Sequence, residues 1–419
     1  MARMAGAVES FEVVVVGAGP AGAAAAIHAV EAGHEVLLLE AGPLGRDKTC
    51  GDGLTPRAVH QLQRLDLAGE VTAQYVNHGL KLHGYGGDVT APWPDSDYGR
   101  VGSAMPRTKF DELLARTAVD RGATLWENAT ASAPELADGR LSSLQVTVAG
   151  VEKQIRAQWV IVADGVRSTF GKQLGRTWHR GEVYGIAARS YCDSPRHDEP
   201  WMHSHVELRG EDDEILPGYG WIFPLGDGTV NLGCGALSTD ARPAKLNTKK
   251  LLHHYAGQQR EAWGLGEPEH VTSALLPMGG AVSNVAGPNW MIIGDAAGGV
   301  NPLNGEGIDY GLEMAEHAVE LIQAGYRDVT REWPRLLRAR YGEAFLLART
   351  AARLLTYPQF LPAVGPLALR GPVGAKLMPA AARLMANLIT DEDRDLMARL
   401  WRTAGRGVTA ARGNTPLWS

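Results

Sequence analysis

The feature that most constrains this chain is a glycine-rich turn placed directly after its first apolar run. Residues 17–22 read Gly-Ala-Gly-Pro-Ala-Gly, follow the β-branched run 11–16 and precede an alanine-rich run. A strand, a tight glycine turn and a helix form a dinucleotide-binding unit, in which the helix N-terminus offers N–H groups to a pyrophosphate. The apolar run 35–39 ends at Glu40, whose carboxylate can accept hydrogen bonds from a ribose. We predict a dinucleotide site at Gly17, Gly19, Gly22 and Glu40; the alternative is a tight turn without a ligand.

Composition narrows the class of protein. The chain has 419 residues, 45% of them hydrophobic and 21% charged, which is typical of a globular protein of two or three domains. Its net charge of −6 argues against a nucleic-acid partner. Three scattered cysteines are too few for a disulfide framework or a zinc site, so we expect no metal and a reducing, cytoplasmic compartment.

Two later segments favour FAD over NAD. The apolar run 158–163 enters an Ala-Asp-Gly-x-x-Ser turn at Asp164. A second run, 290–293, enters the Gly-Asp-Ala-Ala-Gly-Gly segment that begins at Gly294, and a helix is predicted over about 307–323. The carboxylate of Asp295 can hold a ribityl hydroxyl, and N–H groups at the helix start can face the flavin pyrimidine.

Three segments carry a closer resemblance. They read Lys-Thr-Cys-Gly-Asp-Gly-Leu at 48–54, Tyr-Gly-Trp-Ile-Phe-Pro at 219–224, and the Gly-Asp segment extended over 294–310. With them the chain resembles FAD oxidoreductases built like p-hydroxybenzoate hydroxylase, over about residues 11–325. Within that group it is similar to the geranylgeranyl reductase family, which saturates isoprenoid double bonds. The resemblance implies an α/β fold: a Rossmann-like FAD-binding domain, an interleaved, mainly antiparallel β substrate domain and a C-terminal helical region.

The resemblance also implies site residues. Arg107 stands at the start of a predicted helix, and its alternative role is a solvated helix-start charge. Carried over by motif, the implied FAD contacts are Ala21, Glu40, Cys50, Gly51, Gly53, Arg107, Ala131, Asp295, Gly307 and Ile308. The motifs themselves add Asp164, Gly294 and Gly305 to these candidates.

Reduction of an isolated alkene sets chemical requirements. The double bond is electron-rich, so a proton donor must act together with hydride delivery from reduced flavin, and positive charge develops on carbon. Tyr219 and Trp221 alternate on a predicted strand and can present aromatic faces to that charge. Cys50 is the candidate acid, or else a small residue packed against the flavin ring. The resemblance implies a double bond in the isoprenoid side chain of a membrane lipid, with menaquinone favoured over other prenyl lipids.

The source of electrons stays open. No second strand, glycine turn and helix follows Gly22, so a separate nicotinamide domain is not expected. We expect NAD(P)H or another electron donor, such as a protein or a quinol, to visit the flavin transiently.

Two interleaved domains and a tail are predicted. The FAD-binding domain takes residues 1–75, 95–180 and 270–330, and the substrate domain takes 76–94 and 181–269. Residues 331–419 are expected to be helical. Charge separates this tail from the body, because residues 331–419 carry 14 basic and 6 acidic side chains, a net +8, whereas residues 1–330 carry −14.

The tail has two alternative roles. Apolar residues recur at steps of three and four from Trp333 to Leu355, and a second stripe includes Leu377, Ala381, Leu384 and Leu388. Pro358, Pro362 and Pro366 are expected to forbid a continuous helix between the stripes. The stripes either pack on the body or lie on the inner face of the cell membrane, with basic residues at lipid headgroups.

Three rival functions remain. An aromatic hydroxylase of the same fold would add oxygen to its substrate, and a flavin halogenase would also use oxygen. A flavin-binding lipid carrier would catalyse nothing.

Overall fold

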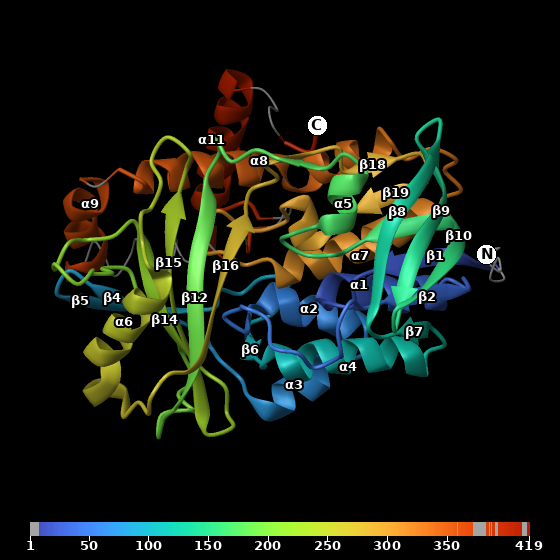
Figure 1. Ribbon diagram of the computed structural model, residues 1–419. Helices are drawn as coiled ribbons and strands as arrows, with labels where there is room; N and C mark the ends of the chain where they lie inside the picture. Colours follow the sequence, from blue (N-terminus) through green and yellow to red (C-terminus); the bar gives the residue numbers. More distant parts are fainter. Residues whose placement is uncertain are drawn as a thin grey trace.

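The structure, a computed structural model, describes residues 8–357, 359–371, 383–384, 386, 388–389, 393–412 and 417–419. Its framework is two large sheets side by side (Figure 1). Two small sheets accompany them: β3 (Gly53–Leu54) with β6 (Ser103–Ala104), and β11 (Thr177–Trp178) with β17 (Val282–Ser283).

The first sheet carries the glycine turn. Its order is β18-β19-β10-β1-β2-β7, with β8 and β9 joined to β10. β1 pairs in parallel with β2 on one side and β10 on the other. Val13 to Val15 are all fully buried, as expected of a parallel strand covered on both faces. The strands are β1 (Glu9–Val16), β2 (Val36–Leu39), β7 (Thr124–Trp126), β8 (Ala129–Ala137), β9 (Arg140–Val148), β10 (Val151–Val162), β18 (Ala286–Gly287) and β19 (Trp290–Ile292).

Helices packed on this sheet include the ones the motifs predict. α1 (Pro20–Glu31) follows the glycine turn and packs against α4 (Arg107–Asp120) and α7 (Ile308–Gln323). The 3-10 helix η1 (Gly294–Ala297) stands before α7. Three shorter helices are α2 (Pro56–Arg64), α3 (Ala68–Gln74) and α5 (Thr169–Gln173).

The second sheet is antiparallel except where β13 pairs with β4. Its order is β16-β12-β15-β14-β13-β4-β5. The strands are β4 (Gly79–Gly84), β5 (Gly87–Pro92), β12 (Tyr184–Asp193), β13 (Met202–His205), β14 (Gly218–Pro224), β15 (Thr229–Ser238) and β16 (Glu269–Pro277). β16 differs from the expected division, in which residues from 270 onward belong to the FAD-binding domain. It belongs to the second sheet because it pairs with β12.

The two faces of the second sheet differ in character. α6 (Thr248–Trp263) covers one face so closely that a Cβ on Gly220 would lie 2.5 Å from the Tyr255 ring. Because side chains alternate along a strand, Tyr219, Trp221 and Phe223 point to the opposite face, toward the first sheet.

The tail is helical and anchored to the body. α8 (Glu332–Leu355) buries Trp333 and Leu337 in the core of the first sheet and Ala352 against the second, so packing on the body is confirmed for this helix. α8 is followed by α9 (Phe360–Leu369) and α11 (Leu396–Arg412) (Figure 1). The helix is interrupted between α8 and α9, as the prolines predict. Pro362 and Pro366, however, both lie within α9, so the prediction is wrong for these two prolines: Pro362 stands in the first turn, where its N–H has no helical partner, and packing of α9 against the second sheet offsets the missing N–H of Pro366.

Two further points concern the tail. Trp418 is fully buried, and its Nε1 donates to Ala297 O over 2.8 Å, so the chain end supports η1. Leu377 and Ala381 of the second predicted stripe lie outside the described residues. Across the described ranges, no helix combines the length and apolarity needed to cross a membrane.

Candidate active site

The glycine turn is set by close backbone contacts. A Cβ on Gly17, which has φ +103°, would lie 2.4 Å from Ala163 O, and one on Gly22 would lie 1.8 Å from Gly17 O. Gly19 is different, because a Cβ there would meet only Arg107 Nη2 at 3.7 Å and Lys48 Nζ at 3.9 Å. Two cations therefore flank an open stretch of backbone at the N-terminus of α1, which fits a pyrophosphate.

One buried carboxylate holds both cations in place. Asp111 is 2% exposed and accepts from Arg107 Nε at 2.6 Å, from Arg107 Nη2 at 2.9 Å and from Lys48 Nζ at 2.8 Å. Burial alone would raise the pKa of Asp111, but Arg107 and Lys48 hold it below its usual value. The alternative of a solvated charge is therefore wrong for Arg107.

Glu40 directly follows β2 and contacts the glycine turn. Its Oε2 accepts from Ala18 N at 3.0 Å, and the residue is 4% exposed. Ala129 N donates to Glu40 O at 2.8 Å, which brings the start of β8, and with it Ala131, beside Glu40.

The second glycine motif meets the first. Cβ atoms on Gly294 and Gly311 would lie 3.0 and 3.1 Å from Ala21 Cβ, so α7 and η1 approach α1 at a small residue. A Cβ on Gly307 would lie 2.9 Å from Asp295 Oδ1, directly before the first residue of α7, Ile308. Burial raises the pKa of Asp295, and nearby Arg107 opposes this. Gly305, with φ +77°, lies in the loop before α7.

The loop that contains Cys50 lies against the aromatic face of the second sheet. A Cβ on Gly51 would lie 3.2 Å from the Phe223 ring, and one on Gly53 would lie 2.5 Å from Met202 Cε. Arg189, which is fully buried on β12, hydrogen-bonds Asp47 and donates to Lys48 O at 2.7 Å. The second sheet therefore determines where this loop stands.

The three candidate catalytic residues gather at this contact. Burial raises the pKa of the Cys50 thiol, and the neighbouring Arg107 guanidinium opposes the rise. Burial also raises the pKa of Tyr219, with smaller contributions from Glu306 and Cys50. The hydroxyl of Tyr219 donates to Asn304 O at 2.5 Å, and its ring lies 5.7 Å from that of Trp221.

Asp164 has a local role. Its carboxylate accepts from Ser168 Oγ at 2.7 Å and from Phe170 N at 2.8 Å, at the start of α5. The contact between this turn and the glycine motif is made instead by the backbone of Ala163.

Sequence reasoning missed several polar residues of the site. Asp111 could have been found, because it stands four residues after Arg107, the spacing of a helical ion pair. For Asn231 the only signal in the sequence is that a polar residue stands inside an apolar strand. Lys48 and Glu306 lie within the recognised motifs, but no sequence spacing relates either residue to the groups that it contacts.

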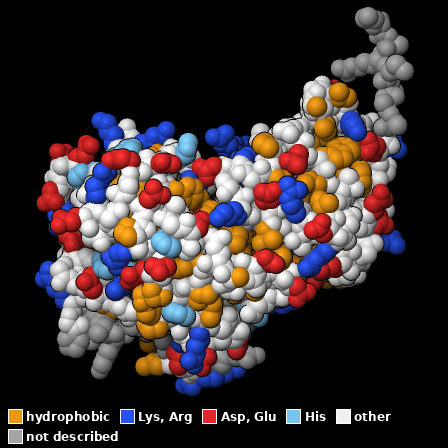
Figure 2. Space-filling model, turned by 90° about the horizontal axis from the view of Figure 1, so that it is seen from below, with side chains coloured by type: hydrophobic (Ala, Val, Ile, Leu, Met, Phe, Trp, Pro, Cys, Tyr) orange, Lys and Arg blue, Asp and Glu red, His pale blue; other side chains and the backbone are white. Residues whose placement is uncertain are grey.

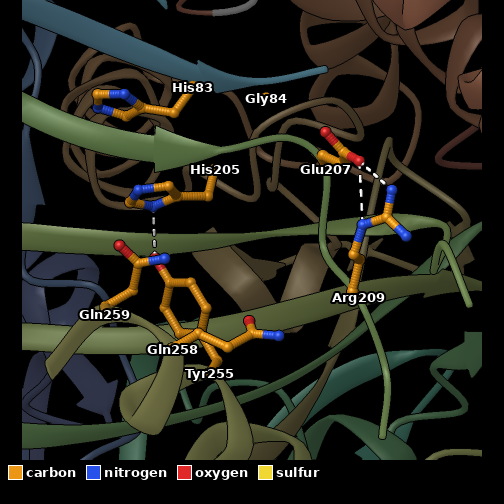
Figure 3. Close-up of a pocket in the computed structure, with 8 residues that line it drawn as sticks. All are labelled: His83, Gly84, His205, Glu207, Arg209, Tyr255, Gln258 and Gln259. Carbon is orange, nitrogen blue, oxygen red and sulfur yellow. Dashed lines mark hydrogen bonds and ion pairs between the residues drawn. The ribbon is translucent and has the colours of Figure 1, made fainter. Parts of the chain in front are cut away.

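Two hollows lie outside this contact. The first, of about 230 Å³, is on the α6 side of the second sheet and is lined by His83, His205 and Tyr255 among others (Figure 3). Tyr255 OH and His205 Nδ1 are 2.6 Å apart, and the His83 and His205 rings stack at 4.6 Å. Burial, and then the charge of His83, lowers the pKa of His205 to about 3. The rings that line this hollow therefore hydrogen-bond to or stack on one another.

The second hollow is an apolar groove of about 230 Å³ between the tail helices and the loop after η1. Leu303 forms part of it and directly precedes Asn304, which accepts from Tyr219. The groove residues are Leu303, Ala351, Leu354, Leu355, Phe360, Leu384 and Trp401.

Comparison with known proteins gives a consistent assignment. Residues 10–333 match the family model described as an FAD binding domain. The chain is 52% identical over 397 residues to the menaquinone reductase of Mycolicibacterium smegmatis, covering 94% of this chain and 96% of that protein. It is 50% identical to the menaquinone reductase of Mycobacterium tuberculosis, covering 95% and 96%. Digeranylgeranylglycerophospholipid reductase 1 of Methanopyrus kandleri is 32% identical and covers 75% and 81%.

Solved structures agree on the fold. A geranylgeranyl bacteriochlorophyll reductase-like protein of Thermoplasma acidophilum has a TM-score of 0.73 at 21% identity, covering 91% of this chain and all of that one. A flavin-dependent brominase also has a TM-score of 0.73, at 18% identity, covering 96% and 100%. The architecture is thus shared by reductases and halogenases, and the predicted fold class is confirmed.

Proposed function

The chain belongs to the FAD-binding-domain family and, within it, to the family of the menaquinone reductases, and from this premise we propose that it hydrogenates a C=C double bond in the isoprenoid side chain of menaquinone. The observation that carries the proposal is the meeting of the Cys50 loop with Tyr219 and Trp221 beside the convergence of the two glycine motifs. A pyrophosphate suits the cations at Gly19, and a ribityl chain suits Asp295. FAD is the cofactor of this enzyme, and in its reduced form it supplies the hydride.

The residues of the chain supply the rest of the chemistry. The Cys50 thiol gives its proton to one alkene carbon while hydride adds to the other, and the thiolate that remains is stabilised by Arg107 until solvent returns the proton. The faces of Tyr219 and Trp221 lower the energy of positive charge developing on carbon. Each turnover consumes one hydride equivalent, which NAD(P)H or another two-electron donor replaces.

Product mass tests this function. Purified protein is incubated without oxygen with menaquinone and dithionite-reduced FAD, the extracted lipid is reoxidised to the quinone so that quinol formation adds no mass, and the isoprenoid side chain is then examined by mass spectrometry. A gain of two hydrogen atoms is expected. A gain of one oxygen atom when air is admitted would instead identify a hydroxylase, and unchanged menaquinone that still binds the protein would identify a lipid carrier.

A membrane-embedded substrate also requires access from the lipid. We propose that the enzyme is cytoplasmic and binds peripherally to the inner face of the membrane through its tail. Supporting this, exposed apolar side chains recur on α9 and α11, where Leu367 is 64%, Leu396 72% and Leu400 56% exposed. The apolar groove lies between these helices and the loop that contains Leu303, so it offers a polyprenyl chain an apolar surface beside that loop. By contrast, the face shown in Figure 2 intersperses acidic and basic side chains with small apolar patches.

A further inference from the structure

Asn231 has an unusual set of partners for a buried side chain. It lies on β15, is fully buried and pairs with Phe223 of β14. Its Nδ2 donates to Cys50 O and to Asp52 Oδ2, both at 2.8 Å. Its Oδ1 accepts from Trp221 Nε1 at 2.9 Å. Because an indole N–H can only donate, the orientation of the amide is determined.

The groups around Asn231 restrict the positions of the Cys50 loop and of the Trp221 indole. Asp52 is 1% exposed, has φ +63° and also accepts from Tyr191 OH at 2.7 Å. The Trp221 ring lies flat against β15, since a Cβ on Gly233 would be 2.1 Å from its Cζ2. The only polar atom of that ring is the one that Asn231 binds.

One amide therefore joins the loop between β2 and β3 to a strand of the second sheet. The Cys50 loop follows the first sheet, and Trp221 is part of the second. We propose that Asn231 is a positioning residue, which holds the Cys50 thiol and the Trp221 face in one relation to the same double bond. This inference rests on the proposed function, in which both groups act on the alkene. Asn231 itself acts only through them, and displacements of about 1 Å in such arrangements can lower rates about a hundredfold.

The test begins with Asn231→Leu, whose side chain has the same number of heavy atoms and the same branching but cannot form the three hydrogen bonds. We expect kcat to fall about a hundredfold, KM to change less than about threefold and FAD content to stay unchanged. We also expect faster alkylation of Cys50 by iodoacetamide in the folded holoenzyme, because its loop is released. Cys192 and Cys234 are 2% and 0% exposed, so labelling reports on Cys50.

A matched control separates positioning from loss of stability. Asn289 is also buried, at 1% exposure, and makes three amide hydrogen bonds, to Leu141 N, Leu141 O and Gln158 O. Asn289→Leu is expected to lower the unfolding temperature by a similar amount, with kcat and Cys50 labelling as in the wild type. If Asn231→Leu keeps wild-type kcat and labelling, or if both variants change alike, the positioning role is wrong.

A second variant covers the case in which Asn231→Leu does not fold. Asn231→Asp keeps the shape, but its carboxylate cannot donate to Cys50 O or Asp52. Its kcat is expected to be low at about pH 8 and to recover toward the wild type at about pH 6, as the new carboxyl takes up a proton and regains a donor. A constant ratio to the wild type would overturn the proposal. Should the wild type reduce no alkene, Cys50 labelling still tests the bridge, so the two failures are distinguishable.

Discussion

At the scale of single residues, the site consists of buried polar groups that bind one another. Asp111 joins Arg107 and Lys48 beside the open backbone of Gly19, and Asn231 joins Cys50 to Trp221. Such groups are costly to bury without a hydrogen-bond partner, so a substitution at one of them destabilises the protein by leaving its partner unpaired. Two predictions concern single side chains.

The first prediction concerns the Cys50 thiol. Cys50→Ala is expected to lower turnover about a hundredfold or more while FAD stays bound, because the proton donor is removed. Anaerobic product formation and flavin absorbance measure the two effects. Cys192→Ala is the control, since Cys192 is buried in the core on the α6 side of the second sheet. Unchanged turnover in Cys50→Ala would assign the thiol to packing against the flavin.

The second prediction concerns Asp52 and pH. Burial raises the pKa of Asp52 to about 6, so the folded protein holds this proton more tightly than the unfolded chain. The stability that this provides is complete below the unfolded pKa of about 4 and is lost as pH rises through about 6. Asp52→Asn keeps an oxygen for Tyr191 and Asn231 but cannot ionise.

We therefore expect the variant to gain stability relative to the wild type by about 3 kcal/mol between about pH 4 and pH 7. Urea unfolding at a series of pH values measures the difference. A difference that does not vary with pH would contradict the raised pKa.

At the scale of elements, close approach depends on glycine in both halves of the site. Gly17 and Gly22 let β1, α1 and the end of β10 meet, whereas Gly233 lets the Trp221 ring lie against β15. The first pair shapes the cofactor turn and the last shapes the substrate side. We therefore expect substitutions at Gly17 or Gly22 to affect FAD binding, and a substitution at Gly233 to affect turnover.

The prediction at this scale is for Gly233→Ala. The added methyl group would lie 2.1 Å from Trp221 Cζ2, so the indole must move off the strand. Turnover is expected to fall at least about tenfold with FAD content unchanged. Gly257→Ala, on the exposed face of α6 with open space at its Cβ, should instead add about 1 kcal/mol of stability at normal turnover. Normal turnover in Gly233→Ala would show that the Trp221 position is unimportant.

At the scale of the whole molecule, the tail is both a structural part and a candidate membrane contact. Trp333 and Trp418 are fully buried against the FAD-binding domain, so removal of the whole tail would expose its core. Substitutions on the exposed side of α9 and α11 test membrane contact without this damage.

The last prediction is that Leu367→Asp combined with Leu396→Asp and Leu400→Asp weakens binding to anionic vesicles about tenfold or more. Three apolar side chains would no longer enter the interface, and three new carboxylates would be repelled. Co-sedimentation with vesicles measures binding. The control is Leu136→Asp with Val151→Asp, which are 46% and 60% exposed near the β8–β10 hairpins. Equal effects of the two sets would contradict a membrane contact specific to the tail.

The amino-acid sequence alone determined the parts that depend on local backbone preference. The glycine turn at 17–22, the helix after Gly307 and the start of a helix at Arg107 were predictable, because each requires particular residue types at short spacing. Only the tertiary structure decided which distant side chains meet. Asn231 and Cys50 are 181 residues apart, Trp418 and Ala297 are 121 apart, and β16 joined the second sheet through its pairing with β12. Such contacts arise when burial of whole sheets and helices brings remote segments together, and no local pattern records the partner that each segment will have.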